Sequence, residues 1–278
     1  FLLTTNNLKD GIWIKNLISK LERIKNVTVR KRTMASGVYD HGYVLGYERV
    51  KDHCPTISDP RHRLWKIRAK KVILATGAIE RPLVFSGNDV PGVMLASAVR
   101  DYIKLYGVSP GDRTVIITNN DNAYKTAIEL NAVGLSVPAI IDVRESTDGI
   151  LANKAKKLGI NVKNAKGISR VLGRKGVKAI CVCSQTGEGT VEETIECDVI
   201  AMSGGWSPVV HLWSHCGGKL VWEDKSGMFI PNFECPPVSD NGEGFVFPVG
   251  SASGAMTTAV CLDISKQTAL TVCSSLGF

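Results

Sequence analysis

The order of buried strands, small-residue turns and β-rich inserts constrains the fold of this chain more than any single motif does. A β-rich insert leads into an apolar strand at residues 70–78, which contains Ala75-Thr76-Gly77. A strand–helix–strand unit follows, then a second β-rich insert and a second apolar strand that ends at Gly204-Gly205. Last comes an apolar strand that ends at Gly250 before a helix. A chain that leaves one dinucleotide-binding fold, forms another and returns to complete the first has this order of elements.

We therefore predict an α/β protein with two nested Rossmann-like dinucleotide-binding folds and small antiparallel β inserts. The first fold should occupy residues 1–107, the second 108–206, and the return to the first 207–278. Apolar residues at helical spacing predict helices at residues 8–24, with one buried face, and at 94–106, 121–133, 148–158 and from about 255. Alternating or continuous apolar runs predict strands at 27–29, 38–50, 64–69, 113–118, 136–142, 160–162, 167–183 (as a hairpin), 190–196, 197–202 and 244–250.

Length and composition exclude several classes of protein. The chain has 278 residues, of which 44% are hydrophobic and 22% are charged, as in a globular protein. Its apolar runs are far shorter than the roughly 20 residues of a membrane-spanning helix, so we expect no membrane association. None of the eight cysteines forms a CxxC pair, and without a secretory signal we expect reduced, buried thiols and a cytoplasmic location. The chain does not begin with Met, and we interpret it as a fragment.

The net charge of +8 raises the question of nucleic-acid binding. Lys and Arg are scattered along the chain but are dense at residues 23–32 and 61–71. Only 6% of the residues are aromatic, and no nucleic-acid-binding motif is recognisable. We therefore expect no nucleic-acid partner, and a basic face that contacts an acidic partner subunit or anionic cofactors is the simpler interpretation.

The turn at Ala75-Thr76-Gly77 is the strongest candidate for ligand binding. Small residues at the carboxyl end of a parallel strand let the backbone approach a phosphate or a ribose closely. The same residues also suit an ordinary turn between a strand and a loop. The continuation through Glu80-Arg81-Pro82 and Val90-Pro91-Gly92-Val93 makes the segment more specific.

The run Val-Ile-Leu-Ala-Thr-Gly-Ala at 72–78 is similar to a recurring segment of flavoproteins of the glutathione-reductase and thioredoxin-reductase type. The longer run at 75–96 resembles alpha subunits of heterotetrameric sarcosine oxidases and related amine, opine and cyanide-forming oxidoreductase subunits. Thr118-Asn119-Asn120-Asp121 and the run Ser-Gly-Gly-Trp-Ser-Pro at 203–208 favour the sarcosine oxidase group. The resemblance covers nearly the whole chain. The family's opening glycine-rich fingerprint and its C-terminal folate-binding half are absent.

The resemblance implies a subunit of an amine oxidoreductase. The complete complex would demethylate sarcosine oxidatively to glycine, form hydrogen peroxide and transfer the methyl carbon to tetrahydrofolate at the missing C-terminal half. It would contain FAD and FMN, together with smaller subunits and a flavin-carrying beta subunit. We recognise no catalytic acid, base or nucleophile in this chain and expect the fragment alone to be inactive. The alternatives are a related subunit that acts on proline, opines or glycine, and a vestigial nucleotide-binding scaffold.

The predicted second fold departs from the dinucleotide-binding fingerprint. Thr118, Asn120 and Ala123 stand at the three positions of Gly-x-Gly-x-x-Gly/Ala, and only Ala123 fits. A side chain at Asn120 would crowd the approach of a pyrophosphate. Asp142 follows at the place of a ribose-binding acid, but without the glycines we interpret it as a strand-end cap. We expect this fold to have lost ordinary NAD(P)H binding.

The first fold differs from an FAD site at Gly250-Ser251. Many flavoproteins have Gly-Asp here, and the Asp accepts hydrogen bonds from the ribityl hydroxyls of FAD. Serine removes that charge, while the amides at the start of the following helix would still bind a phosphate. The resemblance implies NAD in this place, and a purely structural turn is the alternative. The residues expected to bind this cofactor are Met34, Ala75, Thr76, Gly77, Gly250, Ser251 and Thr257.

Two further pairs of residues have an open or a structural interpretation. His211 and His215 share a helix face, but no Glu accompanies them and Gly217-Gly218 ends the helix, so we expect a packed helix end and no metal. Glu80 and Arg81 suit either a structural pair or a polar contact to a ligand, and nothing in the sequence ranks the two.

Overall fold

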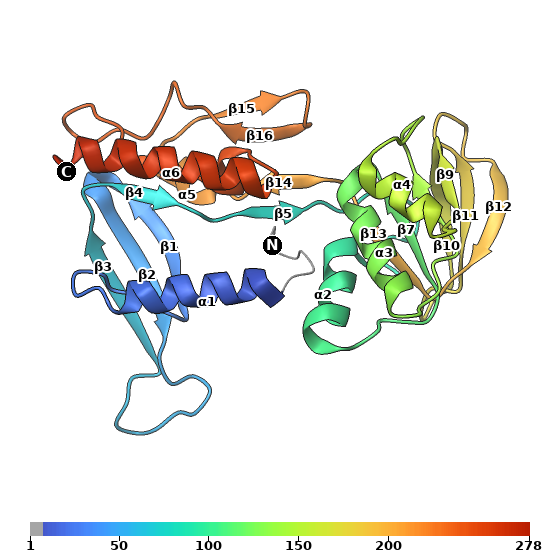
Figure 1. Cartoon of the computed structure of the whole chain (residues 1–278), viewed down its shortest axis with the longest axis horizontal. Coiled ribbons are helices and arrows are strands. Elements are labelled where there is room, and N and C mark those ends of the chain that lie inside the picture. Colours follow the sequence, from blue (N-terminus) through green and yellow to red (C-terminus); the bar gives the residue numbers. More distant parts are fainter. Residues whose placement is uncertain (1–7) are drawn as a thin grey trace. The chain divides into compact units, whose positions relative to one another are not determined.

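A computed structural model describes residues 8–278, which form two compact units (Figure 1). Unit 1 comprises the residues up to Ile79 together with Ser207–Phe278, and unit 2 comprises Glu80–Trp206. The paired strands β5 (Ala78–Glu80) and β14 (Trp206–Pro208) contain both passages of the chain between the units. Residues 80–107, expected with the first fold, make their contacts within unit 2. The division at 1–107, 108–206 and 207–278 stays a prediction about how the two folds are composed.

A five-stranded parallel sheet forms the centre of unit 2. Its strands, in spatial order, are β6 (Val93–Leu95), β13 (Val199–Ser203), β7 (Thr114–Thr118), β8 (Ile140–Asp142) and β9 (Val162–Asn164). Every residue of β7, β8 and β13 is buried. Such continuous apolar runs are typical of strands that are covered on both faces. The predicted strand–helix–strand unit is confirmed by the parallel pairing of β7 with β8.

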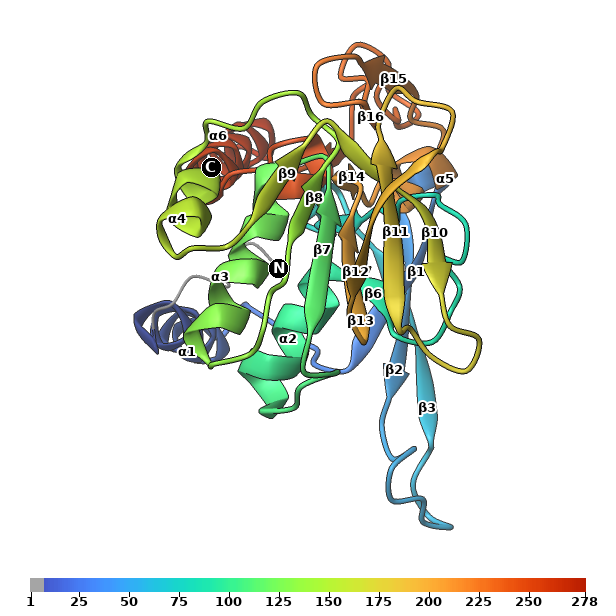
Figure 2. The same ribbon diagram turned by 90° about the vertical axis from the view of Figure 1, so that its right-hand side faces the viewer.

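Helices cover one face of this sheet and an antiparallel sheet covers the other (Figure 2). The helices are α2 (Ala96–Tyr106), α3 (Tyr124–Ala132) and α4 (Ile150–Lys157), and the antiparallel strands are β10 (Lys166–Leu172), β11 (Ala179–Ser184) and β12 (Val191–Glu196). The predicted end of α2 is confirmed at Gly107, which has φ of 63° and donates its N–H to the Ile103 carbonyl. A short 3₁₀ turn, η2 (Asp121–Ala123), leads from β7 into α3.

Unit 1 has smaller sheets. Its elements are α1 (Leu8–Glu22), the antiparallel strands β1 (Thr33–Tyr39), β2 (Tyr43–Arg49) and β3 (His62–Arg68), the parallel pair β4 (Val72–Leu74) and β17 (Val246–Pro248), α5 (His211–His215), the hairpin of β15 (Leu220–Glu223) and β16 (Met228–Pro231), and α6 (Thr258–Ser275). The 3₁₀ turns η1 (Asp40–Gly42) and η3 (Gly250–Ser253) complete it. Its core consists of Val38, Leu74, Trp213, Phe245 and Val246.

The structure corrects several sequence-based expectations. Residues 27–29 form no strand, and the hairpin of β15 and β16 was not predicted. The helix at 8–24 is present as α1, but the expected buried face is wrong because Ile12, Leu17, Ile18 and Leu21 are exposed. The strand at 70–78 is only partly buried, with Ile73 45% exposed. The cysteines are free, and Cys54, Cys235 and Cys273 are exposed rather than buried. Among the described helices, none has both the length and the apolarity needed to span a bilayer.

Candidate nucleotide-binding sites

The predicted turns of the first fold lie at the same edge of a parallel strand pair. Strand β4 pairs with β17 so that Leu74 is opposite Pro248, and the Val249 N–H donates to the Leu74 carbonyl at 2.9 Å. Both strands therefore end side by side. The turn Ala75-Thr76-Gly77 follows β4, and the turn Gly250-Ser251 follows β17. In open α/β sheets, ligands bind beyond the carboxyl ends of the strands, which is where these turns lie.

Thr76 and Gly77 hold their turn against the segment that follows β14. The Thr76 hydroxyl donates to the Val209 carbonyl at 2.7 Å, and the Val209 N–H donates to the Gly77 carbonyl at 2.9 Å. Gly77 has φ of 81°, and a Cβ atom placed on it would meet no atom within 4 Å. The backbone conformation favours glycine, and the space beside it is open within the described chain. This turn fits the close approach of a phosphate or a ribose.

The second turn of this edge is directly followed by helix α6. The Gly250 backbone has φ of 61°, and the buried Ser251 hydroxyl lies 3.8 Å from the Cys261 sulfur in the first turn of α6. Thr257 is the N-cap of α6, and its hydroxyl accepts a hydrogen bond from the Val260 N–H. No acidic residue stands in the first turn of α6. Because the positive end of the helix dipole is not neutralised by a carboxylate, this helix start fits an anionic group.

Met34 is separated from the other predicted cofactor residues. It lies on β1, opposite Tyr47 of β2, and its side chain is 64% exposed. The other six predicted residues, Ala75, Thr76, Gly77, Gly250, Ser251 and Thr257, belong to the β4–β17 edge and the start of α6. Their assignment to a cofactor, and that of Met34, stay predictions.

The degenerate fingerprint of the second fold is closed by its own side chains. The Asn120 amide nitrogen donates to the Ser203 carbonyl at 3.2 Å and to the Ser203 hydroxyl at 3.0 Å. Its amide oxygen accepts from the Asn122 N–H at 3.0 Å, and the Thr118 hydroxyl bonds both backbone groups of Asn120. The side chain of Asn120 thus links the ends of β7 and β13. The second glycine of an intact fingerprint keeps its position free of any side chain.

Asp142 is bonded entirely within the second fold. It is fully buried, accepts from the Tyr124 hydroxyl at 2.8 Å, and accepts from the N–H and the guanidinium of Arg144 at 2.8–3.0 Å. Arg144 also pairs with Asp121 at 2.8 Å. The hydrogen bond from the Arg144 N–H, two residues on, makes Asp142 the predicted strand-end cap. Both carboxylate oxygens therefore already accept hydrogen bonds from internal partners, whereas ribose binding would need them to accept from the ribose hydroxyls.

These contacts shift the ionisation of the residues around Asp142. Burial is the main cause that raises the pKa of Tyr124 well above its ordinary value, and the Asp142 carboxylate adds to it. The hydrogen bond to Asp142 is the main cause that raises the pKa of Arg144. With both pKa values raised, Tyr124 is a neutral phenol and Arg144 is a guanidinium at neutral pH.

The contact of the buried Glu80 with the start of α2 was not foreseen. The Glu80 carboxylate accepts from the Ser97 N–H at 2.9 Å, and Arg100 lies one turn further along the same helix. Burial lowers the pKa of Arg100, and the Glu80 charge opposes that shift. A carboxylate at a helix start is stabilised by the helix dipole. The structure therefore favours a structural role for Glu80, and its distance in sequence from α2 explains why no local pattern predicted it.

The histidine pair forms no metal site among the described residues. Nδ1 of His215 lies 2.9 Å from the Val38 carbonyl, and its ring packs edge-on against Tyr39 at 4.7 Å. Within residues 8–278, no three His, Cys, Asp or Glu side chains gather as a ligand set. A cavity of about 450 Å³ in unit 1 contains none of the predicted site residues. Its lining includes His41, Arg68, Lys70, Ser239, Asp240 and Asn241.

Comparison with known proteins identifies relatives along almost the whole chain. It is 40% identical over 260 residues to the sarcosine oxidase alpha subunit of Rhizobium meliloti (strain 1021) and 34% identical over 275 residues to that of Corynebacterium sp. (strain P-1). These matches include 93% and 96% of the chain but only 25% and 27% of the relatives. The chain is also 23% identical over 239 residues to an opine oxidase subunit of Rhizobium meliloti (strain 1021), covering 78% of this chain and 51% of that protein. No family model matches the chain.

Solved structures share the fold. L-proline dehydrogenase from P. horikoshii superposes with a TM-score of 0.58 at 22% identity, covering 91% of this chain and 42% of that one. Thioredoxin reductase from T. acidophilum superposes with a TM-score of 0.63 at 17% identity, covering 94% and 78%. The predicted α/β fold of the thioredoxin-reductase type and the predicted likeness to sarcosine oxidase alpha subunits are both confirmed. The chain spans about a quarter of the length of these alpha subunits.

Proposed function

We propose that this chain, related along most of its length to alpha subunits of sarcosine oxidase, is the nucleotide-binding part of an amine oxidoreductase subunit. Its own function is to hold one NAD molecule in the first fold and to form the scaffold around it. The groups of NAD that this fold would contact are its anionic pyrophosphate and its two riboses. Ala75, Thr76 and Gly77 would contact NAD from one strand end. Gly250, Ser251 and Thr257 would contact it from the other.

The difference between the two strand-end sites carries this proposal. At the first site, Gly77 has a positive φ and open space beside it, and the paired strand β17 leads to a helix start without an acidic residue. At the second site, Asn120 and Asp142 are bonded to neighbouring side chains and main chain. A single dinucleotide in the first fold agrees with both observations.

The reaction proposed for the complete complex is oxidative demethylation of sarcosine to glycine, with formation of hydrogen peroxide and transfer of the methyl carbon to tetrahydrofolate. FAD and FMN would be held by the complete complex, which includes smaller subunits and a flavin-carrying beta subunit. Tetrahydrofolate would bind outside this chain. The names of the relatives support the assignment to such a complex. The described residues provide binding and positioning, with no group placed for proton transfer to an amine.

The second candidate is a related complex that oxidises opines or proline. It is favoured by the similarity to the opine oxidase of Rhizobium meliloti and by the fold shared with L-proline dehydrogenase. Oxidation rates of the assembled complex with sarcosine, octopine and L-proline separate the candidates. Oxidation of sarcosine alone supports the first, whereas preference for octopine or proline supports the second.

Identification of the released nucleotide tests the binding role. The full-length subunit, purified with its partners, would be denatured and its nucleotides quantified by mass spectrometry. We expect about one NAD per alpha chain in the wild type and a loss of most of it in Gly77→Ala, because a methyl group enters the space for the ligand. Gly107→Ala is the matched control, since Gly107 also has positive φ and open space but lies in unit 2. Release of no nucleotide at all would support the scaffold alternative instead.

A further inference from the structure

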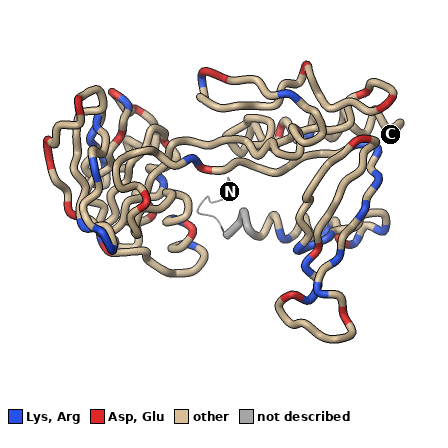
Figure 3. The backbone as a smooth tube through the Cα atoms, turned by 180° about the vertical axis from the view of Figure 1, so that it is seen from behind, with Lys and Arg blue, Asp and Glu red and all other residues tan. Residues whose placement is uncertain are grey.

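The positive charge of the chain is concentrated in one segment. Residues 23–71 contain thirteen Lys and Arg against four Asp and Glu, a net charge of +9. The rest of the chain has 21 against 22, a net charge of −1, which together give the overall +8. This segment includes the three-stranded sheet of β1, β2 and β3, and Figure 3 shows Lys and Arg along its strands. The overall basic character of the protein is therefore a property of this sheet and its connections.

The strand register divides the sheet into an inner and an outer face. Val38 is opposite Val44, and both pack into the core of unit 1 with Leu74 and Phe245. Because alternate residues of a strand point to opposite sides, Tyr47 belongs to the other face, together with the residues opposite it on β1 and β3. We define the outer face by Met34, Tyr47, Arg49, Leu64, Lys66 and Arg68.

The outer face is accessible within the described chain and combines apolar and cationic side chains. Met34 is 64% and Leu64 52% exposed, and both lie opposite Tyr47 on neighbouring strands. Lys66 and Arg68 extend the same face along β3, and Arg49 extends it along β2. Exposed Met, Tyr and Arg side chains are enriched in protein–protein interfaces. An apolar centre with a basic surround fits a partner surface with an apolar centre and an acidic surround.

The chemistry of the outer face favours a protein over a nucleic acid. Single-stranded nucleic acids stack their bases on free aromatic rings beside phosphate-binding cations. Here the Tyr47 ring is stacked on His62 at 5.1 Å, and the Arg68 guanidinium covers the Tyr43 ring at 5.0 Å. Aliphatic groups such as Leu64 contribute to contacts with apolar protein surfaces and not to contacts with phosphates.

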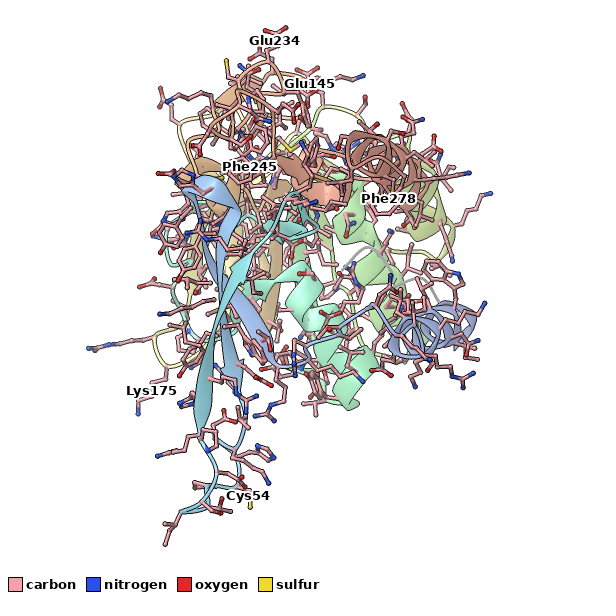
Figure 4. The ribbon with its side chains drawn as sticks, turned by 90° about the vertical axis from the view of Figure 1, so that its left-hand side faces the viewer. Cys54, Glu145, Lys175, Glu234, Phe245 and Phe278 are labelled. Atoms are coloured by element: carbon pink, nitrogen blue, oxygen red, sulfur yellow. The ribbon has the colours of Figure 1, made fainter. Side chains whose placement is uncertain are left out.

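We propose that the outer face of the β1–β3 sheet is the docking surface for an acidic surface of a separate partner subunit. The proposal rests on the proposed function in one respect, namely that the chain is part of a multi-subunit complex. The loop at 50–61 joins β2 to β3 at the far end of this sheet (Figure 4, where Cys54 marks this loop).

Charge and surface variants in the full-length subunit, co-expressed with its partners, test this docking. Lys66→Glu should weaken assembly about tenfold and reduce its dependence on salt, because attraction across the interface becomes repulsion. Leu64→Ser should weaken assembly with the salt dependence unchanged. The matched controls are Lys175→Glu, labelled in Figure 4, and Val84→Ser, at exposed positions of unit 2, and they should assemble like the wild type.

Hydrogen exchange of the unmutated protein provides a second measurement that does not depend on variants. Amides at residues 43–49 and 62–68 should be more protected in the complex than in the isolated full-length subunit. Equal protection of these amides in the complex and in the isolated subunit would mean that no partner covers this face, and the proposal would be wrong. Retention on an oligonucleotide that Lys66→Glu abolishes, with assembly unchanged, would also overturn it.

The failure of this docking and the failure of the proposed function give different results. A complex that assembles and contains NAD, but whose assembly is equally insensitive to Lys66→Glu and to Lys175→Glu, would contradict only the docking surface. A complex that assembles with the predicted sensitivity to Lys66→Glu but contains no NAD would contradict only the nucleotide-binding role.

Discussion

At the scale of single residues, the second fold is closed by replacements that form bonds of their own. Asn120 stands where a glycine would leave room for a pyrophosphate, and its amide bonds Ser203 and Asn122. Asp142 is held by Tyr124 and Arg144. A ligand would have to break the buried hydrogen bond of Tyr124 and several partly buried ones, and buried polar groups are costly to leave unsatisfied. We therefore expect no ordinary NAD(P)H binding at this fold, where the same bonds contribute to stability.

The role of Asp142 predicts a large loss of stability on substitution. Asp142→Asn removes the charge that Arg144 and Tyr124 contact in a fully buried position. We expect the free energy of unfolding of unit 2 to fall by about 1.5–3 kcal/mol, the range for hydrogen bonds to charged groups. Urea denaturation measures it. Asp148→Asn is the control, because Asp148 is exposed and should change stability by less than about 0.5 kcal/mol. Equal effects of both would disprove the role of Asp142.

The phenol of Tyr124 predicts a loss of stability at alkaline pH. Its pKa in the folded protein is raised above the ordinary value of about 10, so its contribution is fully present below pH 10. That contribution is lost progressively as pH rises above 10, because the unfolded chain loses the proton more readily. Tyr124→Phe should be less stable than the wild type at pH 8 and show a smaller further decrease between pH 9.5 and 11. Tyr102→Phe, at an exposed position, should keep the wild-type pH dependence.

The side chain of Asn120 gives a prediction about binding. Asn120→Gly restores one glycine of the fingerprint, but Asp142 remains bonded to Tyr124 and Arg144. We expect no NADH binding at this fold in a fluorescence titration, and a loss of about 1–2 kcal/mol from the missing cap and hydrogen bonds. Saturable NADH binding by this variant, with competition by NAD, would mean that Asn120 alone closes the site.

At the scale of elements, the segments with strongly periodic or continuous apolar residues form the predicted helices and strands. The predictions that were wrong have physical causes. The strands β7 and β13 and the helix α2 follow from continuous or periodic apolar residues, with Gly107 ending α2. The strand predicted at 27–29 has the right residue types but no neighbouring strand to pair with. The apolar spacing of α1 predicts a buried face, although no described element covers that face.

The sequence predicted the turns of the first fold, but not the hydrogen bonds that fill the fingerprint of the second fold. The small residues at 75–77 and 250–251 are local signals, and the structure places them on adjoining strands. The bonds of Asn120 to Ser203 and of Glu80 to Ser97 join residues far apart in sequence, and no local pattern encodes such partners. Met34 was expected with the cofactor residues, but it lies on a separate sheet.

The start of α6 gives a prediction at this scale. Thr257→Ala removes the hydroxyl that accepts from the Val260 N–H, and it should destabilise the first turn of the helix by about 1 kcal/mol. Hydrogen exchange at Val260 and Cys261 should become several-fold faster, while Thr257→Ser should preserve the wild-type rates. Unchanged exchange in Thr257→Ala would show that the cap contributes nothing to this helix start.

At the scale of the whole molecule, the two units differ in the size of their apolar cores. Unit 2 has two large buried clusters, one under the helices and one under the antiparallel sheet. Unit 1 has one small cluster and a parallel sheet of only two strands, β4 and β17. A sheet of two strands buries too little apolar surface to be stable by itself. The pair β4 and β17 therefore depends on packing against the other elements of unit 1. The chain matches only about a quarter of the length of its relatives, which are correspondingly larger proteins.

The difference in apolar core size between the two units predicts the order in which they unfold in the isolated 278-residue chain. In native-state hydrogen exchange, amides of β7 and β13 should be the slowest, and amides of β4 and β17 should exchange by a separate opening of lower free energy. Exchange of all four strands with one common free energy would contradict the independence of the two units.

Binding of one dinucleotide in the first fold is tested most directly by a density map of the assembled full-length protein after saturation with NAD. We expect one dinucleotide, with its pyrophosphate at Ala75-Thr76-Gly77 and the start of α6, and no nucleotide at Thr118–Ala123. A dinucleotide bound at Thr118–Ala123, with Asn120 and Asp142 turned away from their present partners, would contradict this expectation.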